Sequence, residues 1–194
     1  MNEDMEIRDQ LVLFAQRAYE RGLVHGTGGN ISARTQNDKM IIKASGLSLM
    51  DTETDNLMLV DIHSYDWKPN GDYIPSKEYK FHAEIYRQRT EIEAILHVHP
   101  PFATAYAVKG IDIPRLTDAG FRHSAFPCVP FAAGGSEELK DLIAVTLEQN
   151  PECQVMLLEK HGIIAMGADI VTAYNLADLT ESIAHIAYIT LGIK

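Results

Sequence analysis

Two histidines stand two residues apart at the end of the apolar run Ala94–Val98, and two prolines follow them. Successive residues of a β-strand point to opposite faces, so a strand here places His97 and His99 on the same side of a sheet. Pro100 and Pro101 then end the strand, because proline cannot donate to a sheet ladder. The segment therefore predicts a strand that presents two neighbouring imidazoles. Such a pair can hold a metal ion, but two half-buried strand histidines without a metal show the same pattern.

Composition limits the class of protein. The chain has 194 residues, 46% of them hydrophobic and 23% charged, which suits one domain, 1–194, with a sizeable core. The formal net charge of −10 argues against nucleic acid as a partner, because that affinity rests mainly on neutralising phosphates. A small anion is still compatible with this charge, since a few local N–H groups can hold it.

Three features bear on the compartment. No apolar run approaches the roughly 18–20 residues that span a bilayer, so we expect no membrane partner. The sequence begins Met-Asn-Glu-Asp-Met-Glu, which is unlike a secretory signal. Cys128 and Cys153 are too few for a disulfide framework. We therefore expect a cytoplasmic protein.

Hydrophobic periodicity and turn residues predict helices mixed with hairpin-connected strands. Helices are predicted at 4–21, from 75–78 to about 89, and at 102–108, 136–149 and 170–191. Strands are predicted at 30–34, 40–43, 57–62, 94–98, 155–158 and 163–166, and residues 111–131 are expected to be irregular with short strand-like pieces. This order predicts a three-layer α/β domain with a central, largely antiparallel sheet.

A glycine-rich loop, His25–Asn30, separates the first predicted helix from the first predicted strand. Its glycines, Gly28 among them, let the backbone approach a ligand and turn N–H groups toward an anion, and Asn30 adds an amide donor. The loop lacks the Walker ending, and helix followed by strand is the wrong order for a dinucleotide fingerprint. A plain glycine-rich turn is the alternative.

Two further segments could serve the same anion. Ser45 and Gly46 follow a predicted strand, although small-residue turns are common there. Ser76 and Lys77 stand at a predicted helix start, which attracts anions, although simple capping by the serine explains the same residues. Glu78 is either a solvated charge favoured by the helix dipole or a proton-transfer group beside a metal.

A third histidine completes a possible ligand set. His161 follows a predicted apolar strand and precedes Gly162. A lone histidine there is more often structural, yet His97, His99 and His161 together are what a catalytic zinc with an open position requires. His82 lies four residues after Glu78 on the same helical face, and we interpret it as a packing residue or as support for the site.

Taken in order, these motifs resemble those of the class II aldolase/adducin family. They are Gly-Thr-Gly-Gly-Asn-Ile-Ser, Ser-Gly, Pro-Ser-Lys-Glu with Phe-His soon after, His-x-His-Pro, and Lys-His-Gly. The match runs from the first predicted helix to the last, and residues 126–139 are most similar to the family's fuculose-phosphate aldolases. The resemblance implies a three-layer α/β/α domain that assembles as a homotetramer with active sites at subunit interfaces.

The resemblance also implies site roles and an activity. His97, His99 and His161 would ligate one Zn²⁺ per chain, and Glu78 would be the catalytic acid/base. The substrate phosphate would be held by Gly28, Asn30, Ser45, Gly46, Ser76 and Lys77. The implied enzyme is a zinc-dependent lyase that cleaves a small ketose phosphate by retro-aldol chemistry, giving dihydroxyacetone phosphate and an aldehyde, with zinc as the Lewis acid.

We expect no counterpart here of two tyrosines of the fuculose-phosphate aldolases. One belongs to a longer C-terminal tail, and the other would fall within residues 113–118, which contain no tyrosine. Lys77 is more typical of the family's decarboxylases of 3-oxo sugar-acid phosphates, and methylthioribulose-1-phosphate dehydratases share the zinc and the glutamate. These reactions are the alternatives, whereas the family's epimerases carry Asp in place of Glu78. A non-enzymatic adducin-like module fits less well, because such members should lack the metal histidines.

Overall fold

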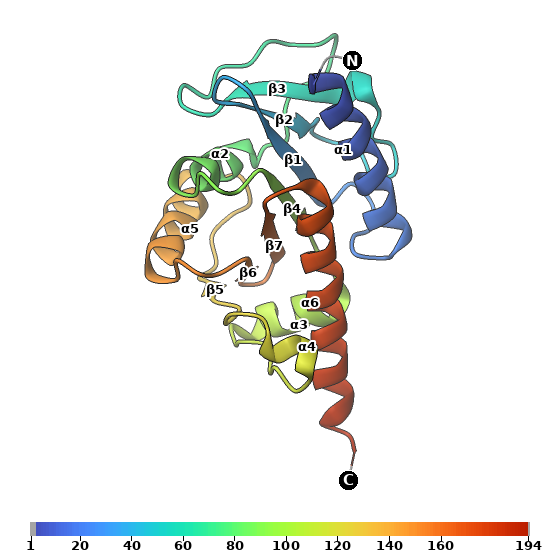
Figure 1. Ribbon diagram of the computed structural model, residues 1–194, viewed down its shortest axis with the longest axis vertical. Helices are drawn as coiled ribbons and strands as arrows, with labels where there is room; N and C mark the ends of the chain where they lie inside the picture. Colours follow the sequence, from blue (N-terminus) through green and yellow to red (C-terminus); the bar gives the residue numbers. More distant parts are fainter. Residues whose placement is uncertain (1–2, 194) are drawn as a thin grey trace.

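The central sheet brings strands from both halves of the chain together in the order β3-β2-β1-β4-β7-β6-β5 (Figure 1). The computed structural model describes residues 3–193. The strands are β1 (Asn30–Thr35), β2 (Lys39–Lys43), β3 (Leu57–Asp61), β4 (Ala94–Val98), β5 (Cys128–Val129), β6 (Val155–Leu158) and β7 (Gly162–Gly167). The helices are α1 (Glu3–Glu20), α2 (Tyr79–Gln88), α3 (Pro101–Lys109), α4 (Asp118–Phe121), α5 (Glu137–Gln149) and α6 (Ile170–Thr190), with a 3₁₀ turn at Thr54–Asn56.

Antiparallel pairing dominates this sheet, as the sequence predicts. Among the described strands only β5 and β6 pair in parallel. The β1–β2 hairpin turns through Asn37 and Asp38 at φ of 64° and 55°, a region that these two residue types tolerate. In the middle of the sheet β4 lies between β1 and β7, so the histidine strand is a central one.

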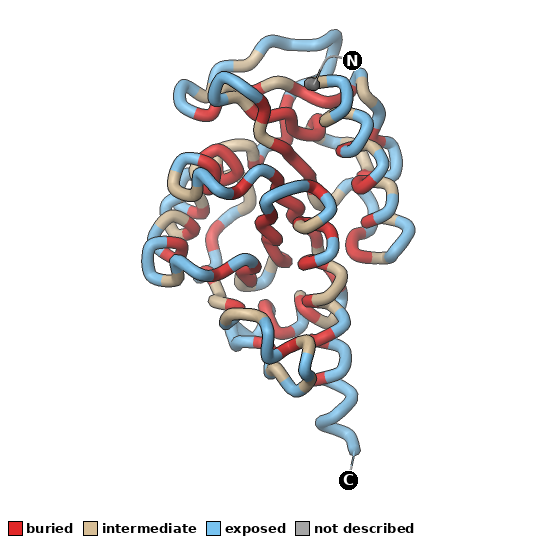
Figure 2. Tube along the Cα trace, viewed as in Figure 1, coloured by how far each residue is buried: buried red, intermediate tan, exposed pale blue. Residues whose placement is uncertain are grey.

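Helices cover both faces of the sheet and form a single three-layer α/β/α domain. Helices α1, α3 and α6 lie on one face, and α2 and α5 lie on the other (Figure 1). Side chains alternate accordingly along β4, where Leu96 packs in the first core and Ile95 in the second. Figure 2 shows the strands buried between these layers. His97 contacts Phe81 of α2, so the histidines face the α2 and α5 layer.

Helix α2 begins later than the sequence predicts. Pro75 and Ser76, which the sequence assigns to its first turn, pair with the end of β2 instead: Pro75 bridges Ala44, and the Ser76 N–H donates to the Lys43 carbonyl at 3.0 Å. The helix starts at Tyr79 with Glu78 as the N-cap residue, so Ser76 is not its N-cap. The pairing with β2 prevails over the local capping preference, and it turns Ser76 and Glu78 toward the end of β1.

The remaining predicted elements lie within a few residues of their expected positions. Ser136 and Asp169 cap α5 and α6 with their side chains. The segment expected to be irregular contains the single-turn helix α4 and the two-residue strand β5. None of the described helices is long and apolar enough to cross a membrane.

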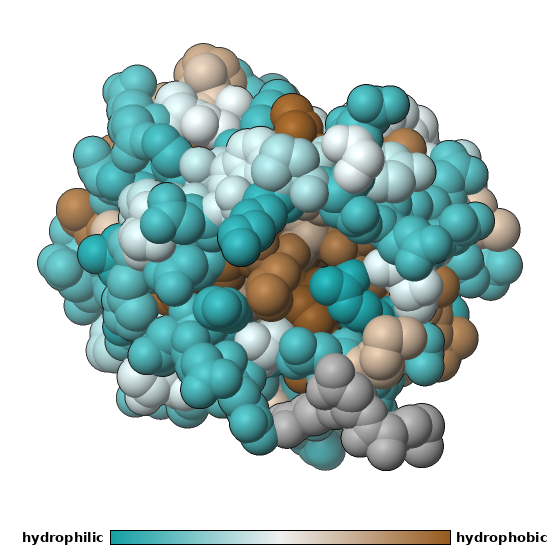
Figure 3. Space-filling model, turned by 90° about the horizontal axis from the view of Figure 1, so that it is seen from above, coloured by the Kyte–Doolittle hydropathy of each residue, from teal (hydrophilic) through white to brown (hydrophobic). Residues whose placement is uncertain are grey.

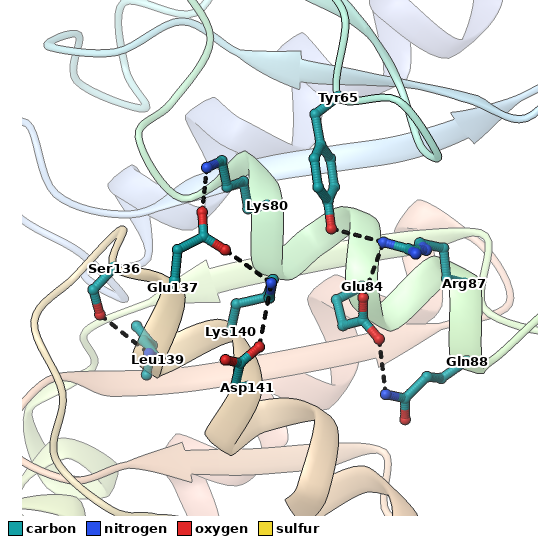
Figure 4. Close-up of polar contacts among 10 residues, drawn as sticks. All are labelled: Tyr65, Lys80, Glu84, Arg87, Gln88, Ser136, Glu137, Leu139, Lys140 and Asp141. Atoms are coloured by element: carbon teal, nitrogen blue, oxygen red, sulfur yellow. Dashed lines mark hydrogen bonds and ion pairs between the residues drawn. The ribbon is translucent and has the colours of Figure 1, made fainter.

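Charged side chains join α2 to α5 on the outer face of the second layer (Figure 4). Glu137, in the first turn of α5, pairs with Lys80 of α2 and with Lys140, whose Nζ lies 2.8 Å from the carboxylate. Hydrogen bonds from these two lysines lower the pKa of Glu137 to about 2, so the carboxylate stays ionised at neutral pH. These exposed contacts help to fix the helix pair that covers the candidate site.

Candidate active site

His97 is the most deeply buried of the clustered histidines. Its Nδ1 lies 2.9 Å from the carbonyl oxygen of Ile163 on the neighbouring strand β7, a contact in which the ring N–H donates. This bond leaves Nε2 with a free lone pair, the form in which an imidazole ligates a metal. The Nε2 atoms of His97 and His99 are 3.1 Å apart, so the strand does place both rings side by side.

His161 reaches the same place from the turn between β6 and β7. The turn is tight because Lys160 adopts a left-handed conformation, with φ of 58°. One ligand atom from each of His97, His99 and His161 lies within 4.8 Å of the others, and no other such group occurs in residues 3–193. The sheet thus brings together the three histidines that the sequence singles out.

Two glycines enclose the ring of His99. A Cβ on Gly28 would lie 2.9 Å from His99 Nδ1, and a Cβ on Gly162 would lie 2.5 Å from His99 Cδ2. Contacts this short are sterically forbidden. The imidazole therefore restricts position 28 to glycine, and at position 162 the Val98 carbonyl oxygen, which would lie even closer to an added Cβ, restricts it as well. Gly28 therefore positions a candidate metal ligand, a role separate from the anion contact that the sequence predicts for it.

Glu78 lies beneath the histidines and is only 4% exposed. Its Oε2 is 3.3 Å from His97 Nε2 and accepts a 2.8 Å hydrogen bond from Asn30 Nδ2. Its Oε1 is 3.5 Å from His161 Nε2 and has no hydrogen-bond partner among the described residues. A buried carboxylate oxygen left unpartnered beside three imidazoles fits a cation at this point.

The electrostatics of the cluster also suit a cation. Burial, with repulsion from neighbouring histidines, lowers the pKa of His97 and of His99 to about 3. Burial lowers the pKa of His161 as well. All three rings are therefore neutral at physiological pH, and metal binding needs no proton to be removed from them. These residues fit the zinc ion that the family resemblance implies.

A pocket of about 350 Å³ opens beside the histidines. It contains every residue that the sequence proposes for an anion, together with three residues of the proposed metal and proton-transfer site. Its lining is Thr27, Gly28, Gly29, Asn30, Lys43, Ser45, Gly46, Ser76, Lys77, Glu78, His99 and His161. Hydroxyl, amide and ammonium groups thus surround one space, which is the chemistry that a phosphate needs.

The side chain of Asn30 points toward Glu78. Its amide nitrogen donates one N–H to that carboxylate and its oxygen contacts His82, so the second N–H of the amide remains as a donor for an anion in the pocket. Ser45, Ser76 and Lys77 supply the remaining polar side chains of the predicted anion group.

Sequence reasoning assigned no site role to Thr27, Gly29 or Lys43 of this pocket. It also missed Gly134, which lies beside Glu78 and Lys77. Lys43 ends β2 and is 2% exposed, and burial lowers its pKa to about 8. A charged residue closing the buried run Met40–Ile42 was the signal that could have revealed it. Gly134 approaches from the loop before α5, where a Cβ would lie 3.0 Å from Glu78 Oε1 and 3.5 Å from Lys77 Nζ. Only the tertiary fold reveals this second contact.

A larger pocket of the described residues lies elsewhere. It measures about 660 Å³ and sits at the outer strand β3, lined by residues that include Met58, Leu59 and Trp67. Figure 3, seen from above, shows an apolar hollow on this face. No clustered histidine borders this pocket, so we assign the chemistry to the smaller pocket.

The three histidines could hold a metal ion, and they lie beside a pocket whose polar lining suits a small anion. Comparison with known proteins identifies the family. Residues 9–188 match the class II aldolase and adducin N-terminal domain, and the chain belongs to this family. Its relatives are named as aldolases, and the chain is a class II aldolase-type enzyme.

Two curated relatives show how close these likenesses are. A 5-methylthioribulose-1-phosphate/5-deoxyribulose-1-phosphate aldolase of Escherichia coli is 30% identical over 98% of this chain and 86% of its own length. An L-fuculose phosphate aldolase of Escherichia coli is 30% identical over 89% of this chain and 78% of its own length. A solved L-fuculose 1-phosphate aldolase superposes with a TM-score of 0.86 at 25% identity, covering 96% of this chain and 87% of that one.

Proposed function

We propose that this chain is a zinc-dependent lyase that cleaves a small ketose 1-phosphate by retro-aldol chemistry, giving dihydroxyacetone phosphate and an aldehyde. One observation carries the proposal: the unpartnered Oε1 of buried Glu78 lies among three neutral histidines, at the wall of a pocket lined by anion-binding groups. Both curated relatives are named as aldolases of sugar phosphates, and the name of the first specifies 1-phosphates, which supports this substrate class.

His97, His99 and His161 would hold the zinc ion, and three protein ligands leave a position for substrate. When bound, zinc supplies Lewis-acid stabilisation of the negative charge that develops on the substrate oxygen. Glu78 carries the proton to and from the reacting carbon through Oε1, while Oε2 stays on Asn30. The phosphate is held by Gly28, Asn30, Ser45, Gly46, Ser76 and Lys77. This contact orients the carbon chain against Glu78.

The first test combines metal analysis with kinetics. Protein purified without chelator should contain one zinc per chain and release dihydroxyacetone phosphate from at least one of fuculose, deoxyribulose and methylthioribulose 1-phosphate. Glu78→Gln should retain the zinc and lose at least about a hundredfold in turnover, the scale typical of general acid–base groups. Glu84→Gln, on the outer side of the same helix, is the matched control. Absence of zinc, or full turnover by Glu78→Gln, contradicts the proposal.

Lys77 favours one alternative reaction. Its ammonium lines the pocket next to Glu78 and could neutralise a substrate carboxylate, which suits a decarboxylase of 3-oxo sugar-acid phosphates. Release of CO₂ from such a substrate, without cleavage of any ketose 1-phosphate, would select this reaction. Elimination of water from methylthioribulose 1-phosphate, without carbon–carbon cleavage, would instead select the dehydratase.

We also propose that the chain forms a homotetramer in the cytoplasm, with active sites at the subunit interfaces. The apolar side chains exposed at the end of α6 support an assembly: Tyr188, Ile189 and Leu191 are 59%, 49% and 81% exposed. Cys128 and Cys153 are free thiols in this structure, which agrees with a reducing compartment. Analytical ultracentrifugation tests the assembly directly.

A further inference from the structure

A continuous chain of buried hydrogen bonds runs away from Glu78 into the second core. Asn30 Nδ2 donates to Glu78 Oε2 at 2.8 Å, and the Oδ1 atom of the same amide contacts His82 Nε2. Ser32 Oγ lies 2.8 Å from His82 Nδ1 and 2.8 Å from the Tyr86 hydroxyl. Asn30, Ser32, His82 and Tyr86 are each no more than 2% exposed. The proposed chemistry gives no role to the part of this hydrogen-bond chain that lies beyond Asn30.

The chain forms because a helix and a strand run side by side with matched spacing. Glu78, His82 and Tyr86 recur every four residues along α2, a rise of about 6 Å per step. Asn30 and Ser32 recur every two residues along β1, which is close to 6.6 Å. The helical and strand side chains can therefore alternate, and each polar group from one element meets its neighbour from the other.

Each hydrogen bond in the chain has one possible direction. A carboxylate can only accept, so the amide nitrogen of Asn30 faces Glu78 and its oxygen faces His82. That oxygen must accept, so His82 carries its proton on Nε2. His82 Nδ1 then accepts from the Ser32 hydroxyl, and Ser32 Oγ accepts from Tyr86. Every donor thus points toward Glu78.

The surroundings of His82 agree with a single neutral form of its ring. Burial lowers its pKa to about 3, so a second ring proton, which would reverse the bond to Ser32, is not present near neutral pH. Phe81 stacks on the imidazole with centroids 4.7 Å apart, which fixes the plane of the ring. Packing and hydrogen bonds together leave the imidazole one orientation.

We infer that Asn30, His82, Ser32 and Tyr86 are positioning residues that hold one carboxylate oxygen of Glu78 in place and leave the other oxygen free for proton transfer. The inference rests on the proposed role of Glu78 and deepens it. His82, four residues from Glu78, sets the orientation of the Asn30 amide without touching substrate.

Nitrogen NMR of the histidine side chains tests this arrangement without any substrate. In metal-free wild-type protein, the His82 signals, assigned by their loss in His82→Phe, should report a neutral ring protonated at Nε2. Glu78→Gln should shift the Nε2 resonance, because it changes the acceptor at the end of the chain. Glu84→Gln, only two residues from His82, should not shift it. Protonation at Nδ1, or equal shifts in the two variants, would overturn the inference.

Kinetics provide the second arm, with whichever substrate the wild type accepts. His82→Phe keeps the aromatic packing and removes both hydrogen bonds, so kcat should fall by about tenfold or more, as is usual for residues that orient a functional group. KM and zinc content should stay near wild-type values. His82→Gln offers an amide donor to Asn30 and should recover much of the lost kcat. Tyr86→Phe, at the far end, should have the smallest effect.

Ile85→Val is the control for lost stability, because Ile85 is fully buried in the same core and lies outside the hydrogen-bond chain. An equal fall in kcat for Ile85→Val and His82→Phe, or no recovery with His82→Gln, would show a merely structural role and overturn the inference. A wild type that turns over no sugar phosphate contradicts the proposed function instead. The NMR result then still decides whether the chain orients Glu78.

Discussion

Gly28 leaves room for the ring of His99 because it has no Cβ. We predict that Gly28→Ala weakens zinc binding by about tenfold or more, since the new Cβ displaces His99 from its ligating position. The backbone of Gly28 is not in the left-handed region, so the substitution crowds the ring without straining the chain. Titration of the metal-free protein with zinc against a competing chelator measures the effect.

Gly26→Asn is the matched control within the same loop. Gly26 has φ of 59°, which asparagine tolerates, and nothing lies within 4 Å of its missing Cβ. Zinc affinity should therefore stay near the wild-type value. Equal affinities for Gly28→Ala and the wild type would show that His99 is not constrained by this glycine.

His82 makes the free energy of unfolding depend on pH in the acid range. Its pKa is about 3 in the folded protein, and the ordinary pKa of a histidine is about 6.5, so between these pH values the unfolded chain binds a proton that the folded chain does not. The free energy of unfolding of the metal-free protein therefore falls as pH falls through this window, and this group contributes up to about 1.4 kcal/mol per pH unit.

Urea unfolding at several pH values, for the wild type and His82→Phe, isolates this contribution. The wild-type free energy of unfolding should fall more steeply from about pH 6 to pH 4, because His82→Phe lacks the titrating ring. The other buried histidines titrate in both proteins and cancel in the difference. Parallel pH profiles would show that His82 is not neutral and buried in the folded state.

Among the helices, α3 depends on a carboxylate from another element. Glu181 of α6 accepts hydrogen bonds from the Phe102 and Ala103 N–H groups, at 3.0 and 2.8 Å, at the helix N-terminus. We predict that Glu181→Ala lowers the free energy of unfolding by about 1–2 kcal/mol, the usual cost of a lost N-cap. Glu181→Gln keeps an acceptor and should cost less. Urea unfolding measures both variants.

Glu148→Ala, an exposed position of α5, serves as the control and should leave stability almost unchanged. A cost for Glu181→Ala no larger than for this control would show that α3 does not need its carboxylate cap.

The elements could be predicted where local signals and tertiary contacts agree. The apolar run Ala94–Val98 predicted the right strand, and the range 136–149 predicted helix α5 to within one residue. The start of α2 was predicted too early, because Pro75 and Ser76 pair with β2, a contact between residues about thirty positions apart. Single-turn α4 and two-residue β5 carry too little periodicity to be recognised.

For the site, the sequence supplied the residue types, and the fold supplied their directions. His97, His99, His161 and Glu78 were singled out from spacing and family resemblance, and the structure brings them together. The engagement of both ends of the Asn30 amide could not be predicted, because it depends on α2 lying along β1. Three-dimensional proximity, which no local pattern encodes, decides such contacts.

At the scale of the whole molecule, the C-terminal end of α6 extends away from the sheet (Figure 1) and exposes apolar side chains. We predict that Leu191→Asp weakens assembly, because a charge there opposes burial in an interface. Sedimentation velocity should show smaller species, and turnover should fall with them if sites form between subunits.

Val171→Asp is the control on the opposite end of the same helix, where the side chain is 45% exposed. A negative charge in the first turn suits the helix dipole, so folding should be unaffected. Unchanged sedimentation by both variants would place the interface elsewhere.

The three histidines come from strand β4 and from the turn that joins β6 to β7, and Glu78 stands at the start of α2. An ion held by these residues is also a reversible cross-link between segments more than sixty positions apart in the chain. Because the ion binds only the folded state, this cross-link raises the barrier to opening the sheet. The lifetime of the folded protein in a cell should therefore rise and fall with the supply of zinc, independently of any substrate.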